Sequence, residues 1–195
     1  MYEFIRGKLH SVTPASCSIE TGGIGYFLFI SVQTYSALKD KANKEVFLYL
    51  HQIVREDAQL LYGFSSTPER EMFRLLIGVS GIGAGTAMVV LSSMTPGEIA
   101  GAIATENVTA LRNIKGIGTK TAQRIIVDLK DKVSQFGEKQ EISLPADNRI
   151  FNESLSALVT LGFAKSSVKK VVDKILAQHP EITLEEVIRE ALKQL

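Results

Sequence analysis

The sequence predicts an α+β protein in which a β-rich N-terminal part precedes two helical parts. Short runs of β-branched and aromatic residues, separated by tight-turn residues, fill the chain up to Phe64. From Thr67 onward, the signals are those of helices, including capping residues and apolar residues spaced three and four apart. We expect four segments: a barrel domain (1–64), a helical domain (65–133), a flexible polar linker (134–148) and a three-helix domain (149–195).

Five strands are expected in the first segment. Pro14 and the Gly22–Gly25 cluster mark turns, and Val32–Leu38 forms a short connecting segment. Five strands within such a short segment suggest a small closed barrel, for which the five-stranded OB-fold is the commonest solution and a generic small β-domain the alternative. The expected strands are Phe4–Leu9, Ser18–Glu20, Tyr26–Ser31, Lys44–Val54 and Gln59–Phe64.

The helical segments begin with recognisable caps. Thr67-Pro68-Glu69 places a cap, a first-turn proline and an acid in the order that a helix N-terminus prefers, and Thr95–Glu98 repeats this as a capping box. Three amphipathic helices follow the linker, the last behind a Thr183…Glu186 capping box. A domain of under about 50 residues is marginally stable alone, so it should gain stability by docking.

Charge and cysteine content exclude several classes of protein. The 22 Lys and Arg residues nearly balance 21 Asp and Glu residues, so nucleic-acid affinity must come from local patches. One cysteine, Cys17, cannot form an internal disulfide, and the three scattered histidines predict no structural zinc. We expect no metal or other cofactor. With no signal peptide and no apolar run of membrane-spanning length, the sequence predicts a cytoplasmic protein without a membrane partner.

An internal repeat is the most informative feature of the chain. Val79–Ala87 aligns without gaps on Ile114–Ala122, which begins 35 residues later. Each copy predicts a helix, a Gly-hydrophobic-Gly hairpin and a second helix. The glycines permit a tight turn and close approach of a partner, and the unpaired amides of the second helix favour a phosphate. A site of this kind binds DNA backbone without reading bases.

The second copy also gathers cations, whereas Ser80, Gly85 and Val89 occupy the positions of the first copy that correspond to Lys115, Lys120 and Arg124. The cations between positions 112 and 132 are Arg112, Lys115, Lys120, Arg124, Lys130 and Lys132. We therefore expect charge mainly from the second hairpin and amide contacts from the first. A hairpin that needs glycine only to turn is the alternative, and a dinucleotide-binding turn is disfavoured because Met72–Leu76 is helical in pattern. Candidate DNA-binding residues are Gly81, Ile82, Gly83, Gly85, Thr86, Lys115, Gly116, Ile117, Gly118, Thr119, Lys120, Thr121 and Arg124.

The repeat is similar to the tandem helix-hairpin-helix of DNA-binding proteins, and the string Val54–Phe64, followed by Glu69-Arg70, closely resembles the RuvA family of Holliday junction recognition subunits. The resemblance covers nearly the whole chain. One departure is Gly85, where the family usually has lysine. Without that lysine, the first hairpin cannot make this side-chain contact with phosphate, while its backbone contacts are unaffected. The resemblance implies that Glu56 and Asp57, at a turn between two strands, form an acidic pin at the junction centre.

The resemblance also implies the function and the partners. A RuvA-like chain binds four-way junction DNA, holds it open and square-planar, and recruits the hexameric ATPase RuvB for branch migration in recombination, DNA repair and the SOS response to DNA damage. It has no catalytic site of its own, forms a homotetramer or a pair of tetramers, and joins the RuvC resolvase in a larger complex. The implied RuvB-binding residues are Leu158, Leu161, Phe163 and Leu192.

Three other functions are also compatible with the sequence. One is a generic structure-specific repair module, and another is a hairpin-type DNA glycosylase or lyase, for which Lys120 and Asp128 are the candidate residues. A third is a protein-interaction scaffold, because Leu161-Gly162-Phe163 resembles ubiquitin-associated-type bundles. ATP hydrolysis must belong to another chain, since the Gly116–Thr121 stretch lacks the spacing of a Walker motif.

Overall fold

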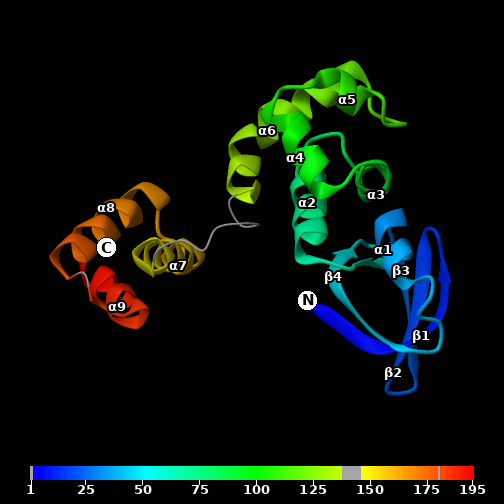
Figure 1. Ribbon diagram of the computed structural model, residues 1–195, viewed down its shortest axis with the longest axis horizontal. Coiled ribbons are helices and arrows are strands. Elements are labelled where there is room, and N and C mark those ends of the chain that lie inside the picture. The colour runs from blue at the N-terminus through cyan, green and yellow to red at the C-terminus, as the bar shows by residue number, and fades with distance from the viewer. Residues whose placement is uncertain (1, 138–145, 180) are drawn as a thin grey trace. The chain divides into compact units, whose positions relative to one another are not determined.

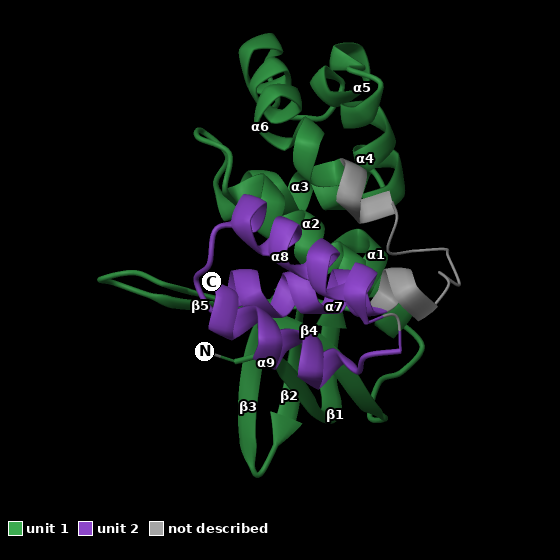
Figure 2. Cartoon of the chain, turned by 90° about the vertical axis from the view of Figure 1, so that its left-hand side faces the viewer, with its two compact units in different colours: residues 1–140 green, residues 141–195 purple. Residues whose placement is uncertain are grey.

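A computed structural model describes residues 2–137, 146–179 and 181–195. The chain divides into two compact units, residues 1–140 and 141–195 (Figure 2). Each unit is described by itself below.

Unit 1 begins with a closed five-stranded barrel, which confirms the predicted fold class (Figure 1). Its strands are β1 (Phe4–Thr13), β2 (Ser16–Thr21), β3 (Ile24–Ile30), β4 (Glu45–Val54) and β5 (Gln59–Phe64). They pair in the order β1-β2-β3-β5-β4, and β4 closes on β1. All neighbours are antiparallel except β3 and β5. Alternate residues such as Leu9, Ile19, Leu28 and Leu48 fill the interior.

Three strands are longer than the sequence indicated. β3 begins at Ile24, two residues before the expected Tyr26, because Ile24 and Gly25 still pair with β2. β1 continues to Thr13 because its first half pairs with β4 and its second half with β2, across an irregularity between Leu9 and Ser11. β2 extends to Ser16–Thr21 because all six of its residues pair with β3. The connecting segment Val32–Leu38 is a helix, α1, which Ser31 caps through its hydroxyl.

Five helices complete unit 1, namely α2 (Thr67–Ile77), α3 (Ala84–Ser93), α4 (Pro96–Ala104), α5 (Val108–Arg112) and α6 (Thr119–Gly137). The N-cap of α2 is Ser66, one residue before the expected Thr67, because the Ser66 side chain accepts the amide of Glu69. The capping box of Thr95 and Glu98 is present as predicted. The helices share one apolar core with the outer faces of β4 and β5.

The expected linker, 134–148, overlaps helices at both of its ends. The helical backbone of α6 continues to Gly137, and α7 starts at Ala146. The residues between these helices, 138–145, lie outside the described part of the chain.

Unit 2 consists of α7 (Ala146–Thr160), α8 (Lys165–Gln178) and α9 (Leu184–Gln194). Gly162, at φ 101°, supports the turn from α7 to α8. The predicted capping box of Thr183 and Glu186 begins α9. The core residues are Leu158, Val168, Val172, Ile175, Val187 and Ala191.

The described helices were compared with the length and hydropathy of a membrane span. Within these residues, no single helix is long and apolar enough to cross a membrane, while α3 and α4 pass only as a pair bent by 96°.

Candidate nucleic-acid interface

The two copies of the glycine repeat form hairpins with the same backbone geometry. The first hairpin joins α2 to α3, and the second joins α5 to α6. Gly81 and Gly116 have φ values of 91° and 90°, in the left-handed region that favours glycine. In each copy the isoleucine amide, of Ile82 or of Ile117, donates to the carbonyl three residues earlier at 3.0 Å. The repeat in sequence is therefore a repeat in structure.

Each hairpin leads directly into a helix N-terminus. The amide of Ala87 donates to Gly83 at 3.0 Å and that of Ala122 to Gly118 at 2.9 Å, which are the first intrahelical bonds of α3 and α6. The preceding amides of each helix have no intrahelical acceptor, and Gly83 supplies no side-chain cap. A Cβ added at Gly83 or Gly118 would meet nothing within 4 Å. The space before these amides is open to an anion such as phosphate.

The isoleucine of each hairpin anchors the turn in the apolar core. Ile82 and Ile117 are 5% and 4% exposed and belong to the core of unit 1. Their side chains are thus excluded from DNA contact, and among the candidate residues these two can offer only main-chain groups. Exposed residues of the candidate set are Gly81, Gly83, Gly85, Lys115, Gly116, Gly118, Thr119, Lys120 and Arg124, whereas Thr86 and Thr121 are half-buried.

Of the two hairpins, the second supplies the positively charged side chains. Lys115 lies in its turn, and Lys120 and Arg124 lie on the first two turns of α6. The guanidinium of Arg124 also donates to the carbonyl of Ser80 at 3.4 Å, so the second hairpin's helix touches the first hairpin's turn. Both hairpins therefore belong to one surface, with cations on one half and amides on both.

One cation counted from the sequence is already paired. Lys130 forms a hydrogen-bonded ion pair with Glu106, which precedes α5. The hydrogen bond and then the charge of Lys130 lower the pKa of Glu106, and the same two effects raise the pKa of Lys130. We therefore expect less phosphate binding from Lys130 than from Lys120. The 24 residues that separate the partners hide this pair from local sequence patterns.

The two acids of the proposed pin lie at the tip of the β4–β5 hairpin. The amide of Arg55 donates to the carbonyl of Ala58 at 2.8 Å, which closes the loop around Glu56 and Asp57. Both acids are exposed. Figure 2 shows this hairpin extending away from the barrel, so its charge is presented to solvent and not to the core.

A buried carboxylate joins the barrel to the helical part of unit 1. Glu69, on α2, is only 1% exposed and accepts hydrogen bonds from the hydroxyls of Ser31 and Thr34 and from Ser65. Its neighbour Arg70 pairs with Glu3 and lies over the ring of Tyr49. Sequence reasoning took Glu69 only as a first-turn acid. The cluster of Ser and Thr residues beside it was the available signal.

In unit 2, the structure separates the four proposed partner-binding residues. Leu158 is fully buried, which corrects its assignment to the surface: it lies on the inner face of α7 and packs in the core. Leu161 and Leu192 are 61% and 45% exposed. Phe163 is half-buried and packs against the core. Of the four, only Leu161 and Leu192 are exposed to solvent.

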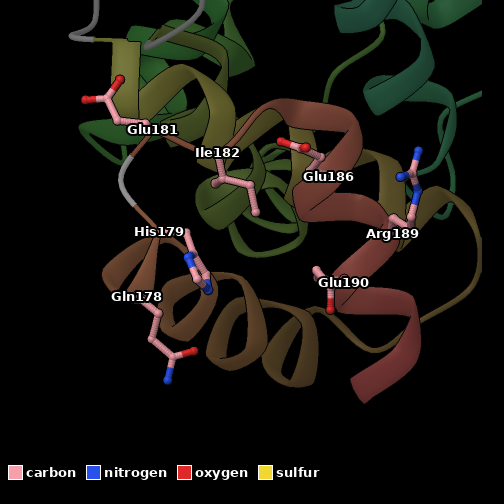
Figure 3. A pocket seen from close by; sticks show the side chains of 7 residues that line it. All are labelled: Gln178, His179, Glu181, Ile182, Glu186, Arg189 and Glu190. Carbon is pink, nitrogen blue, oxygen red and sulfur yellow. The ribbon is translucent and has the colours of Figure 1, made fainter.

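Figure 3 shows a shallow hollow of unit 2 between the end of α8 and α9. Its lining includes His179, Glu181 and Ile182 near the connection from α8 to α9, and Glu186 and Glu190 on α9 (Figure 3). Glu186 is engaged in the capping box, where its hydrogen bonds with Thr183 lower its pKa. This hollow holds none of the residues proposed from the sequence.

The glycosylase alternative lacks support in the geometry. Lys120 and Asp128 are both exposed on α6, whereas a glycosylase encloses the flipped base in a close-fitting pocket. Within the described residues, no group of three His, Cys, Asp or Glu side chains is placed to hold a metal ion.

Three family models match most of the chain, and relatives with known names match it over its full length. Residues 1–63 match the RuvA N-terminal domain, 73–131 the SAM-like helix-hairpin-helix tandem, and 149–195 the RuvA C-terminal domain. Three relatives carry the name Holliday junction branch migration complex subunit RuvA. They come from Christiangramia forsetii, Flavobacterium psychrophilum and Bacteroides thetaiotaomicron and are 46%, 45% and 44% identical, with full coverage of both chains in each case.

Proposed function

The chain belongs to the RuvA family, and from this premise we propose that it binds four-way DNA junctions as the non-catalytic subunit of a branch migration complex. RuvB supplies ATP hydrolysis in that complex. The protein acts in homologous recombination and in the repair of damaged DNA, and we place it in the cytoplasm.

The paired hairpins are the observation that supports junction binding most strongly. Each presents amides without intrahelical acceptors beside glycines that allow close approach, and one adds exposed cations. Contacts to the phosphate backbone carry no sequence information. A protein that uses such contacts distinguishes DNA by the placement of its strands, which suits a junction of any sequence.

The acidic loop gives the proposed complex its centre. In a homotetramer with fourfold symmetry, each subunit places two hairpins on one arm of the junction, and Glu56 and Asp57 lie where the strands cross. A pair of unit charges about 4 Å apart interacts by ~1 kcal/mol in water and ~4 kcal/mol at an intermediate dielectric constant. Repulsion of this size guides strands apart and disfavours stacking of the arms. A second tetramer enclosing the DNA is compatible with this arrangement.

Unit 2 is the proposed contact with RuvB. Its exposed leucines, Leu161 and Leu192, provide apolar surface, and Phe163 supports the turn beside Leu161. We also propose that RuvC joins the larger complex to resolve the junction.

Branch migration tests the proposal directly. The chain, RuvB and ATP are mixed with a labelled four-way junction, and separation into two duplexes is followed on a native gel. We expect products only when the chain, RuvB and ATP are all present. Equal product from RuvB with and without the chain would refute the proposed role.

A further inference from the structure

Helix α1 connects the barrel to the first hairpin through side-chain hydrogen bonds. We propose that Gln33 and Thr34 of α1 are positioning residues, which fix the first hairpin relative to the acidic β4–β5 loop and thereby give selectivity for junctions over linear duplex. This inference rests on the proposed function and deepens it.

One set of bonds reaches the helix that follows the first hairpin. The side-chain amide nitrogen of Gln33, Nε2, donates to the carbonyls of Leu91 and Met94 at 2.9 and 2.8 Å. Its neighbour Val32 donates its main-chain amide to the hydroxyl of Ser92 at 3.2 Å. Figure 1 shows α1 lying between the barrel and α3. Because the N-terminus of α3 carries the first hairpin's amides, α1 fixes the opposite end of the same rigid helix.

A second set reaches the helix that precedes the hairpin. The hydroxyl of Thr34 donates to Glu69 at 2.7 Å and accepts the amide of Ser65 at 2.9 Å. Ser31, the cap of α1, donates to the other oxygen of the same carboxylate. Thr34, Glu69 and Ser31 are all buried, so these bonds are shielded from water. α1 thus holds both helices of the first hairpin.

The first hairpin needs this support more than the second. It has no cation at the positions that Lys115, Lys120 and Arg124 occupy in the second copy. Its amides must approach a phosphate oxygen to about 2.7–3.2 Å with good alignment, because hydrogen bonds weaken steeply outside that geometry. Charges act over a longer distance, up to about 10 Å at moderate salt. When other contacts already fix the position of the DNA, a small displacement therefore weakens the contacts of the first hairpin more than those of the second.

The acidic loop lies on the same framework. The chain passes from α1 into β4, whose far end carries Glu56 and Asp57, and β5 returns from this loop to α2. The positions of the acidic loop and of the first hairpin therefore both depend on the position of α1. A junction offers a crossover and arms at fixed separation, so a binder that must contact both depends on this spacing. A linear duplex makes no such demand.

The test compares Thr34→Val, which keeps the side-chain shape and removes the hydroxyl, with Thr34→Ser, which retains the hydroxyl. Gln33→Met removes the two bonds to α3 at a half-buried position, and Ser36→Ala on the exposed face of α1 is the matched control. Dissociation constants for a four-way junction and for a linear duplex of the same sequence are measured by fluorescence anisotropy, at a temperature where circular dichroism shows each variant folded.

We expect Thr34→Val and Gln33→Met to lower the junction-to-duplex selectivity about tenfold, the equivalent of one amide-to-phosphate hydrogen bond. Duplex affinity should change little, and Thr34→Ser and Ser36→Ala should keep the selectivity of the original chain. If Thr34→Val does not fold, Gln33→Met decides the outcome. Unchanged selectivity, or equal loss for both DNAs, overturns the positioning role. An original chain without junction preference overturns the proposed function itself.

Discussion

Removal of the two lysines at the second hairpin should change the salt dependence of DNA binding by a calculable amount. Lys115 and Lys120 are exposed beside the open amides. Each phosphate contact contributes about 0.9 to the slope of log affinity against log salt on duplex DNA. The variant Lys115→Ala/Lys120→Ala should therefore reduce the slope by about 1.8 for each chain that contacts DNA. Between about 50 and 200 mM salt, the original chain should lose roughly tenfold more affinity than the variant does.

The assay is a series of anisotropy titrations with one junction at several salt concentrations. The matched control is Lys169→Ala/Lys170→Ala, which removes the same charge from exposed positions on α8 of unit 2. We expect the control to keep the original slope, and the hairpin variant to weaken binding equally for junctions of different sequence. A hairpin variant whose slope equals that of the control would refute phosphate contact by these lysines.

Four further changes test separate parts of the structure. Gly116→Ala should lower the free energy of unfolding by about 1–2 kcal/mol because of its φ of 90°, and also weaken DNA binding; an unchanged thermal midpoint would contradict this. Glu56→Gln/Asp57→Asn should retain or strengthen junction binding in gel shifts while altering branch migration; markedly weaker binding would count against the pin. A chain of residues 1–140 should bind junctions without supporting RuvB-driven migration, and loss of both activities would contradict separate units. Leu161→Ala should reduce RuvB capture in a pull-down without changing the thermal midpoint, since the side chain is 61% exposed; undiminished capture would argue against it.

The local features of the fold could be predicted from the sequence. Turn glycines, capping boxes and the hairpin repeat each depend on residues a few positions apart, so their signals lie within a short window. Gly81 and Gly116 lie in tight turns, as the repeat predicted, with φ values of 91° and 90°. The strand ends were less predictable. β1 runs past Leu9 because it pairs with two different strands, and such pairing is decided by distant residues.

Contacts between distant segments were the part that sequence reasoning missed. Glu69 has the pattern of an exposed helix-capping acid, yet it is buried because α1 brings two hydroxyls to it from more than 30 residues away. Lys130 belongs to the cation-rich stretch of the sequence, yet in the structure it forms an ion pair with Glu106. Leu158 and Leu161 have the same chemistry, and only the packing of three helices decides which one is buried.

Competition between DNA forms tests the account most directly. The full chain is bound to a labelled four-way junction and challenged with unlabelled linear duplexes that have the sequences of its arms, at a salt concentration near 150 mM. The account predicts that a large excess of linear duplex leaves the labelled complex intact, whereas unlabelled junction at a concentration equal to that of the labelled junction displaces about half of it. Displacement by both competitors at the same concentration would contradict recognition by the placement of strands.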